Sequence, residues 1–277
     1  MVLPKLSERE VSGKKVLLRL DLDVGRDTSR VESAKETLVF LAENSAQTII
    51  IGHKGRPGGK EVSELSLEPL AKVIEGLVDQ EVTFSPETPG EGKITLLENL
   101  RFDKREEEND ENFAKELASL ADFYVNEAFA VSHRPHASIV GIPKFLPHAA
   151  GFRFIGEVEN LSKVIENPKR PFIVLISGIK EDKVEMAKAL AGKADKVLIG
   201  GKLPKYFGDT NPPEKLMLAD LTFDGFDITL NSAGRFKAEI AKAGTIVLAG
   251  VLGKYEDEGY RQGTQEVFKA VAESDAF

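Results

Sequence analysis

The chain has 277 residues, of which 42% are hydrophobic and 30% charged, and its formal net charge is −8 at pH 7. This composition is typical of a globular protein, and the acidic balance argues against general binding of nucleic acid. The absence of cysteine excludes disulfides and thiolate metal sites, and it fits a cytoplasmic location. No apolar run reaches the length of a membrane span, so we expect no membrane partner.

Strand-like apolar runs alternate with helix-period segments through the first half of the chain. The expected strands are short and rich in Val, Ile and Leu, and they cover residues 15–20, 48–52, 82–84, 94–97 and 123–125. The expected helices cover residues 33–44, 66–78 and 106–120, the last of them acidic and exposed. This alternation predicts a parallel sheet that is covered by helices on both faces.

The alternation begins again in the second half. Strands are expected at residues 172–176, 195–199 and 245–249, and helices at 184–190, 235–243 and 264–273. Residues 204–226 are rich in Pro and Gly and predict a long irregular connection. Between the halves, residues 151–167 combine a helical apolar period with flanking prolines, which is typical of an interdomain connector.

We therefore predict an α/β protein of two doubly wound, Rossmann-like domains, each built on a parallel sheet, joined by a helix. Residues 1–150 form the N-terminal domain, residues 151–167 the interdomain helix and residues 168–277 a shortened C-terminal domain. A chain of 277 residues is long enough for two such domains.

Basic and acidic side chains follow four expected strands of the first half, and one arginine opens the first helical stretch. These residues are Asp21, Asp23, Arg30, His53, Arg56, Arg101 and Arg134. Open α/β sheets bind ligands at the carboxyl ends of their strands, and guanidinium groups suit carboxylate and phosphate. Taken singly, each arginine is more simply a surface cation, and the two aspartates are turn residues. Together they predict an anion site, without a metal, because no third metal ligand has suitable spacing.

Three loops of small residues follow the expected strands of the second half. They read SGIKEDK at residues 177–183, GGK at 200–202 and GVLGKYE at 250–256. Glycine and lysine at the start of a helix suit phosphate, and glycine lets a flat ring approach the backbone. Each loop alone is equally well explained as a simple turn, but three at successive strand ends predict a nucleotide site.

Several blocks of this sequence also resemble the phosphoglycerate kinase family, in order, along nearly the whole chain. They include RLDLDV at residues 19–24, GHKGRPGGK at 52–60, LLENLRF at 96–102 and YVNEAFAVSHRPHASIVGIPKFLP at 124–147, followed by the three loops just described. The resemblance implies reversible phosphoryl transfer between 1,3-bisphosphoglycerate and ADP, giving 3-phosphoglycerate and ATP in glycolysis, with Mg²⁺ accompanying the nucleotide. It also implies that the N-terminal domain binds the glycerate and the C-terminal domain the nucleotide.

The resemblance assigns roles to particular residues. For the glycerate it implies contacts from Asp21, Asp23, Arg30, His53, Arg56, Arg101 and Arg134. For the nucleotide it implies Lys180 and Lys183 at the phosphates, Gly200 and Gly201 beside adenine, and Glu256 at the ribose. Arg30 and Lys180 would be the catalytic pair, because they would share the charge of the transferring phosphoryl group.

The sequence departs from the family pattern in places, and two alternatives follow. Asp23 stands where the family has asparagine, the segment after Gly201 is short, and the Gly-Gly-Gly-Asp-Thr segment that binds magnesium has no counterpart. The chain is then an incomplete or divergent kinase, or a non-catalytic module that binds 3-phosphoglycerate. A purely structural relic is disfavoured by the retained arginines. We expect a monomer.

Overall fold

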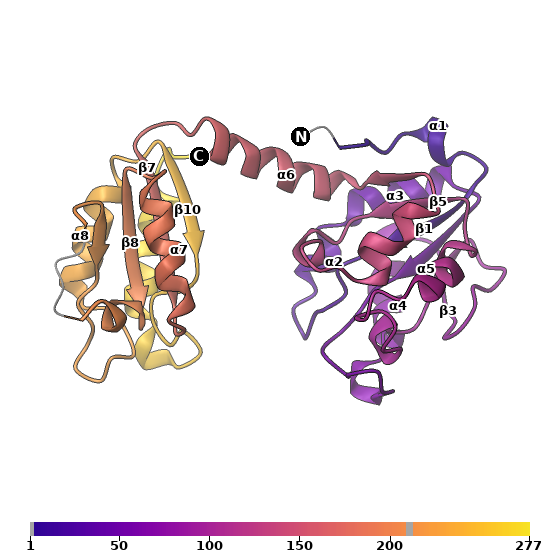
Figure 1. Cartoon of the computed structure of the whole chain (residues 1–277), viewed down its shortest axis with the longest axis horizontal. Helices are drawn as coiled ribbons and strands as arrows, with labels where there is room; N and C mark the ends of the chain where they lie inside the picture. The colour runs from indigo at the N-terminus through magenta and orange to yellow at the C-terminus, as the bar shows by residue number, and fades with distance from the viewer. Residues whose placement is uncertain (1–2, 209–212) are drawn as a thin grey trace. The chain divides into compact units, whose positions relative to one another are not determined.

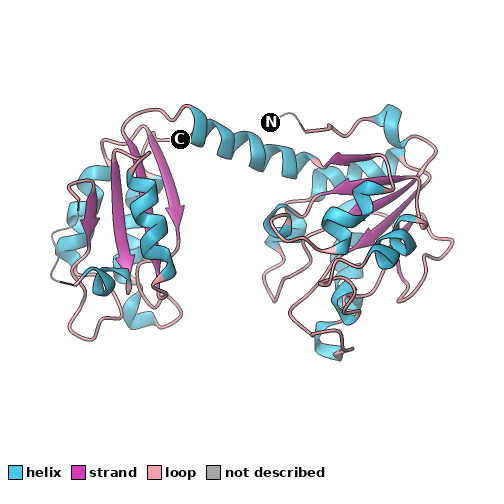
Figure 2. Ribbon diagram, viewed as in Figure 1, coloured by secondary structure: helices cyan, strands magenta, loops and turns pink. Residues whose placement is uncertain are grey.

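The computed structural model describes residues 3–208 and 213–277 (Figure 1). The chain divides into two compact units, Met1–Asn160 and Leu161–Phe277, which we call the N-terminal and C-terminal units. Each unit is a parallel β-sheet with helices packed on it (Figure 2). Over the described ranges, no helix is both long enough and apolar enough to cross a membrane.

The sheet of the N-terminal unit has six strands in the order β3-β4-β2-β1-β5-β6, and every neighbouring pair is parallel. Its strands are β1 (Lys15–Arg19), β2 (Gln47–Ile51), β3 (Val82–Phe84), β4 (Ile94–Leu96), β5 (Phe123–Asn126) and β6 (His148–Ala150). Its first five helices are α1 (Glu8–Val11), α2 (Ser29–Glu32), α3 (Lys35–Asn44), α4 (Glu68–Val78) and α5 (Glu111–Ala118).

Strand β1 shows why its residues form a strand at the centre of this sheet. Val16 and Leu18 pack with α3 and α4 on one face, whereas Leu17 packs with α5 on the other. Successive side chains of a strand point to opposite faces, so a strand covered on both sides must be apolar throughout. The apolar run VLL at the centre of KVLLR therefore encodes a strand that is buried on both faces.

The sheet of the C-terminal unit has four parallel strands in the order β10-β7-β8-β9. They are β7 (Phe172–Gly178), β8 (Lys196–Gly201), β9 (Leu216–Leu218) and β10 (Thr245–Ala249). Helix α7 (Asp182–Ala191) packs on one face, and α8 (Leu230–Ile240) and α9 (Gln262–Ala272) pack on the other. Short helical turns complete the two units at Ser63–Leu65, Leu100–Phe102, Phe129–Val131, Ala137–Gly141, Ile142–Lys144, Leu203–Phe207 and Glu258–Tyr260.

Helix α6 (Phe152–Glu166) contains the division between the units, and its start is anchored in the N-terminal unit. The buried Glu127 carboxylate accepts hydrogen bonds from the backbone N–H of Arg153 at 3.1 Å and of Phe154 at 3.0 Å. The Thr37 hydroxyl donates to the same carboxylate at 2.5 Å. An acid at this position satisfies N–H groups that the first turn of a helix leaves without partners.

The predicted fold class, two doubly wound parallel-sheet domains joined by a helix, is confirmed. Two strands of three residues were missed: β6, whose sequence HAA has no strand signal, and β9, which lies within the expected irregular connection. Residues 209–212 of that connection lie outside the described residues. The expected exposed helix 106–120 begins only at Glu111, and Glu106 is fully buried. Its buried contacts with the segment after β5 explain that difference.

Candidate functional site

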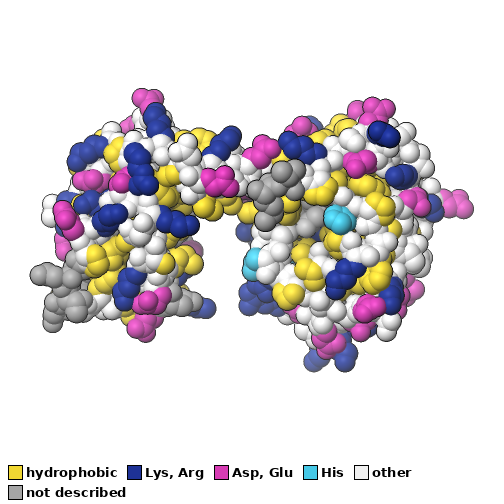
Figure 3. Space-filling model, turned by 45° about the horizontal axis from the view of Figure 1, so that its top comes forward, with side chains coloured by type: hydrophobic (Ala, Val, Ile, Leu, Met, Phe, Trp, Pro, Cys, Tyr) yellow, Lys and Arg dark blue, Asp and Glu magenta, His cyan; other side chains and the backbone are white. Residues whose placement is uncertain are grey.

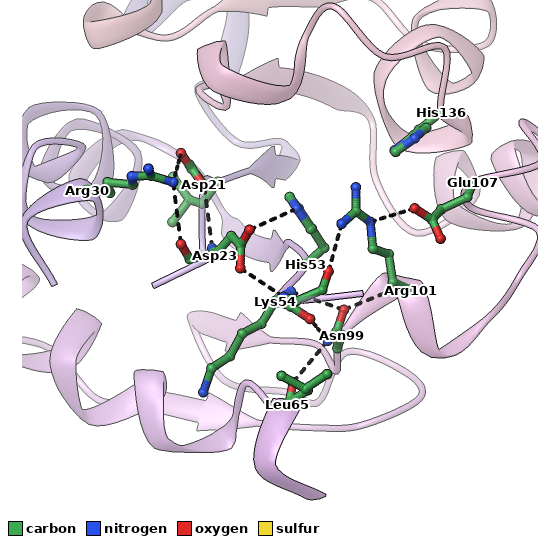
Figure 4. Close-up of polar contacts among 12 residues, drawn as sticks. Asp21, Asp23, Arg30, His53, Lys54, Leu65, Asn99, Arg101, Glu107 and His136 are labelled. Carbon is green, nitrogen blue, oxygen red and sulfur yellow. Dashed lines mark hydrogen bonds and ion pairs between the residues drawn. The ribbon is translucent and has the colours of Figure 1, made fainter. Parts of the chain in front are cut away.

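The carboxyl ends of four adjacent parallel strands carry the predicted anion-binding residues. Asp21 follows β1, His53 follows β2, Arg101 follows β4 and Arg134 follows β5, and these strands are neighbours in the sheet. The order of connections reverses between β1 and β5, which is where open α/β sheets characteristically bind ligands. The topology therefore delivers these side chains to one edge of the sheet, and Figure 4 shows Asp21, His53 and Arg101 there.

Arg30 lies beside the two aspartates that follow β1. Its Nη1 is 3.7 Å from Asp21 Oδ2 and donates to the Asp23 backbone carbonyl at 3.5 Å. The Arg30 side chain is 53% exposed, whereas that of Asp21 is 5% exposed. An exposed guanidinium that is held only by long contacts remains available to an oxyanion.

The Asp23 carboxylate joins the loop after β1 to the loop after β2. Its Oδ1 accepts a hydrogen bond from the backbone N–H of Gly55 at 2.8 Å, and its Oδ2 lies 3.9 Å from His53 Nε2. Gly55 has a φ of 66°, a left-handed conformation that favours glycine and aims this N–H at the aspartate. Asp23 is therefore an acid inside a basic neighbourhood.

His53 is buried and surrounded by positive charge. Its Nδ1 lies 2.8 Å from Arg19 Nη2. Burial lowers the pKa of His53 to about 2, and the nearby Arg19, Arg101, His136 and Arg134 act in the same direction. The imidazole is therefore neutral throughout the physiological pH range.

Arg101 is fixed by the loops around it. Its backbone N–H donates to Asn99 Oδ1 at 3.1 Å, and its Nη1 donates to the Gly55 carbonyl at 2.7 Å. Its Nε lies 3.3 Å from Glu107 Oε1. Asn99 also donates to the carbonyls of Lys54 and Leu65, so that one amide ties three segments together. Arg101 is thus a rigidly held cation next to His53.

Two more predicted arginines lie free in this region. Arg56 is exposed and Arg134 is half-buried, and within residues 3–208 and 213–277 neither side chain makes a hydrogen bond or ion pair. The neighbouring His136 is buried, which lowers its pKa, and Arg101 and Arg134 add to that shift. Unpaired guanidinium groups beside two neutral histidines give the site the polarity that a multiply charged anion requires.

The sequence missed the buried residues that support this site. Arg19, Glu106 and Ser138 are all fully buried and are hydrogen-bonded to one another beneath His53. A buried arginine is hard to recognise from the local sequence. The only signal, and a weak one, is an arginine at the end of an otherwise apolar strand. The wider surface gives no comparable signal, because Figure 3 shows acidic and basic side chains intermingled on the visible face of each unit.

The C-terminal unit contains a cavity of about 750 Å³ at the carboxyl ends of its strands. It is lined by the loops after β7, β8 and β10, together with Gly225 and Phe226 from the connection between β9 and α8. Of the predicted nucleotide residues, Lys180, Lys183, Gly201 and Glu256 line it. A volume in the range of 300–1,000 Å³ is typical of small-molecule and cofactor sites.

Gly200 is not part of that lining. A Cβ at this position would lie 2.3 Å from Leu252 Cδ2, so the glycine allows β8 to pack closely against the loop after β10. Gly201 has a φ of 60°, and a Cβ there would meet the backbone of Gly178. Glycine is therefore required at the two positions for different reasons. At Gly200 it allows close packing, and at Gly201 it allows a left-handed turn at the cavity.

Lysines surround the cavity. Lys183 Nζ donates to the Ser177 carbonyl at 2.9 Å, while the Lys180 side chain has no partner within the described part of the chain. Lys202 and Lys254 place Nζ 5.2 Å and 5.7 Å from the centre of the Phe226 ring. The sequence missed Phe226, because it lies in an irregular connection with no period of its own.

The residues present do not form a metal centre. No group of three or more His, Cys, Asp or Glu side chains that could hold a metal exists within the described ranges, and Glu256 is the single carboxylate among the cavity-lining residues. Mg²⁺ commonly keeps several waters and binds chiefly to substrate phosphates, with one or two protein carboxylates. The described residues therefore offer no cage of several protein ligands, and a Mg²⁺ ion in this cavity would be held chiefly by the phosphates of a bound nucleotide.

Fold and site together define an α/β protein that binds phosphorylated ligands, with an arginine-rich edge in one unit and a lysine-lined cavity in the other. The family model described as phosphoglycerate kinase matches residues 6–214 and 208–277. The chain belongs to the phosphoglycerate kinase family, as its sequence predicted. Its function is that of a kinase of glycolysis.

Individual relatives support this assignment. The phosphoglycerate kinase of Finegoldia magna is 34% identical over an alignment of 340 residues. The alignment covers 98% of this chain and 86% of the relative. That of Bartonella bacilliformis is 41% identical over 220 residues, 73% of this chain and 55% of the relative. The phosphoglycerate kinase structure from Coxiella burnetii superposes with a TM-score of 0.82 at 28% identity, covering 100% of this chain and 87% of that one.

Proposed function

We propose that this chain catalyses the reversible transfer of a phosphoryl group between 1,3-bisphosphoglycerate and ADP, which yields 3-phosphoglycerate and ATP. The observation that carries this proposal is the convergence of Arg30, His53, Arg101 and Arg134 at the carboxyl edge of one sheet, in a chain of this family. Residues 1–150 would hold the glycerate and residues 168–277 the nucleotide. The helix at residues 151–167 would join them.

On the glycerate side, the arginines and His53 bind the carboxylate and phosphate oxygens of 3-phosphoglycerate. Arg56, Arg101 and Arg134 provide charge, and Asp21 would accept a hydrogen bond from a ligand hydroxyl. The exposed Arg30 is held by long contacts alone and neutralises the phosphoryl group as it moves. Such a transfer needs positioning and charge neutralisation, with no covalent intermediate on the protein.

On the nucleotide side, Lys180 and Lys183 meet the phosphates, Gly201 lies at the base and Glu256 accepts hydrogen bonds from ribose hydroxyls. Their place around one cavity at the strand ends supports these roles. Lys180 is the catalytic lysine, since it is unpaired in the described structure. Mg²⁺ bound to the phosphates of the nucleotide would supply further positive charge.

We further propose that the chain works as a cytoplasmic monomer that binds neither nucleic acid nor a membrane. The net charge of −8 and the lack of cysteine support this setting. A module that binds 3-phosphoglycerate without catalysis is the second candidate, because the described residues include no cluster of three or more side chains that could hold a metal.

Replacement of Arg134 by alanine tests the glycerate site. Loss of a charge-assisted hydrogen bond costs about 1.5–3 kcal/mol, so the Kd for 3-phosphoglycerate should rise roughly tenfold to a hundredfold. Calorimetric titration of 3-phosphoglycerate into the full chain measures this change. Arg9→Ala removes an exposed arginine on α1 and is the matched control.

An unchanged Kd in the Arg134→Ala chain would remove that residue from the site, and no binding in the original chain would refute the proposed glycerate site. A spectrophotometric assay of ATP formation from 1,3-bisphosphoglycerate and ADP then separates the two candidates. Turnover supports the kinase, whereas glycerate binding without turnover supports the binding module.

Asp23→Asn is expected to lower the Kd for 3-phosphoglycerate several-fold. The substitution removes a negative charge beside His53 but keeps an oxygen for the Gly55 N–H. Like charges at an interface oppose binding, and two charges about 4 Å apart interact by roughly 1 kcal/mol even in bulk water. Calorimetry at fixed ionic strength measures the change, and Asp79→Asn, an exposed position at the end of α4, makes the same charge change elsewhere. Weaker binding in Asp23→Asn would show that the carboxylate itself contributes to the site.

A further inference from the structure

The strongest feature that the proposed function leaves unused is the buried polar chain beneath His53. Arg19 is fully buried at the end of β1, and its Nη2 lies 2.8 Å from His53 Nδ1. An arginine side chain carries only donors and stays charged in proteins. His53 Nδ1 must therefore accept this hydrogen bond, and the ring proton of the neutral imidazole must lie on Nε2.

We propose that Arg19 is a positioning residue that holds His53 as a neutral imidazole with its proton on Nε2. In this state His53 presents a hydrogen-bond donor, rather than a second positive charge, to the anionic ligand. The Nε2–H group lies toward the half-exposed Asp23, whose Oδ2 is 3.9 Å away (Figure 4). The identity of that ligand rests on the proposed function, whereas the protonation state of the free protein does not.

The other donors of Arg19 prevent it from turning away. Its Nε donates to Ser138 Oγ at 3.0 Å, and its Nη1 donates to the Leu20 carbonyl. Both partners belong to buried segments, one just after β1 and the other at the turn that follows β5. The guanidinium group is thus held by three hydrogen bonds, and His53 accepts the third.

Ser138 is itself oriented by a buried acid. Its hydroxyl donates to Glu106 Oε1 at 2.6 Å, and its backbone N–H donates to Glu106 Oε2 at 2.9 Å. Because the single hydroxyl proton goes to Glu106, the Ser138 oxygen is left to accept from Arg19. The series of hydrogen bonds runs from Glu106 through Ser138 and Arg19 to His53. The number of donor hydrogens on each group determines which group donates in each of these bonds.

The charges of the buried Arg19 and Glu106 compensate each other. Burial lowers the pKa of Arg19, and the Glu106 carboxylate opposes that shift. A buried positive charge is tolerated when a buried acid and hydrogen bonds compensate it. Glu106 therefore keeps Arg19 charged, and the charge of Arg19 in turn disfavours a proton on His53.

The groups that face His53 act mostly in one direction. Burial lowers the pKa of His53 most, and Arg19, Arg101, His136 and Arg134 lower it further, whereas Asp23 is the acid in ion-pair contact with the ring. Asp23 is exposed and 3.9 Å away, so its charge is well screened by water. His53 consequently donates to its ligand with the same strength across the physiological pH range.

Nitrogen-15 NMR of the imidazole rings in the full-length, ligand-free chain tests this inference directly. We expect His53 to show a protonated Nε2 and an unprotonated Nδ1 from pH 5.5 to 8.5, with no titration. His133 and His148 are exposed and serve as internal controls for the ring signals of solvent-accessible histidines. His53→Gln identifies the His53 signals. A titrating His53, or a proton on its Nδ1, would overturn the proposal.

Two variants separate positioning from a merely structural role. Arg19→Met removes the donor, and the ring proton of His53 should then exchange between Nδ1 and Nε2, while burial continues to lower the pKa of the ring. Arg19→Lys keeps a charged donor and should restore the neutral Nε2–H form. If Arg19→Met does not fold, Ser138→Ala frees the guanidinium while keeping its charge, and His53 should then exchange between tautomers. A fixed Nε2–H tautomer in folded Arg19→Met or Ser138→Ala chains would refute the role of Arg19. Failure of 3-phosphoglycerate to bind would refute the proposed function alone.

Discussion

Replacement of Arg30 by alanine is expected to reduce kcat by roughly a thousandfold while the Kd for 3-phosphoglycerate changes less than about threefold. Arg30 lies at the edge of the site, exposed and held by contacts of 3.5 and 3.7 Å, and it is poised to follow a moving phosphoryl group. Removing a charge that acts mainly on the transition state lowers kcat more than binding, and losses of this size are known for such groups.

The experiment compares steady-state kinetics and calorimetry for Arg30→Ala and Arg26→Ala. Arg26 is exposed in the same loop region and has no contact that involves the site in the described structure, so its removal controls for lost positive charge. A raised KM with unchanged kcat in Arg30→Ala would instead show that Arg30 binds the ground state. Equal losses in both variants would show that only general charge matters.

The parts of the fold that follow from local pattern were predictable from sequence. The strands β1, β2 and β7 are buried on both faces, so their apolar runs are continuous and easily recognised. The residues that follow them also were predictable as site candidates, since parallel strands deliver their carboxyl ends to one edge. Strands of three residues, such as β6 and β9, carry too few residues to show a period.

What could not be predicted depends on contacts between distant segments. Glu106 looks like part of an exposed acidic helix, yet it is buried because Ser138, 32 residues later, needs a hydrogen-bond acceptor. Phe226 belongs to an irregular connection but reaches the cavity of the C-terminal unit. In both cases the residue type is visible in the sequence, but the residues that it contacts are brought next to it only when the chain folds.

Glu127 illustrates how such a contact can support the site from a distance. Its carboxylate is buried and caps the start of α6, and Arg153 on that first turn donates from Nη1 to the Arg30 carbonyl at 3.0 Å. Burial raises the pKa of Glu127, and the hydrogen bonds from Thr37, Phe154 and Arg153 oppose that shift. The anchor of α6 and the backbone of Arg30 therefore belong to one hydrogen-bonded network within the N-terminal unit.

Glu127→Ala is expected to lower the free energy of unfolding of the N-terminal unit by about 3 kcal/mol, because it leaves a buried hydroxyl and two helix N–H groups without acceptors. It should also lower kcat, since the segment that carries Arg30 loses one of its supports. Urea unfolding followed by circular dichroism measures the first effect, and hydrogen exchange at residues 152–156 localises it. Glu157→Ala on the same helix removes a partly exposed acid 3.6 Å from Arg153, and it should cost less than about 1 kcal/mol. Equal destabilisation by the two variants would mean that the cap contributes no more than a surface ion pair.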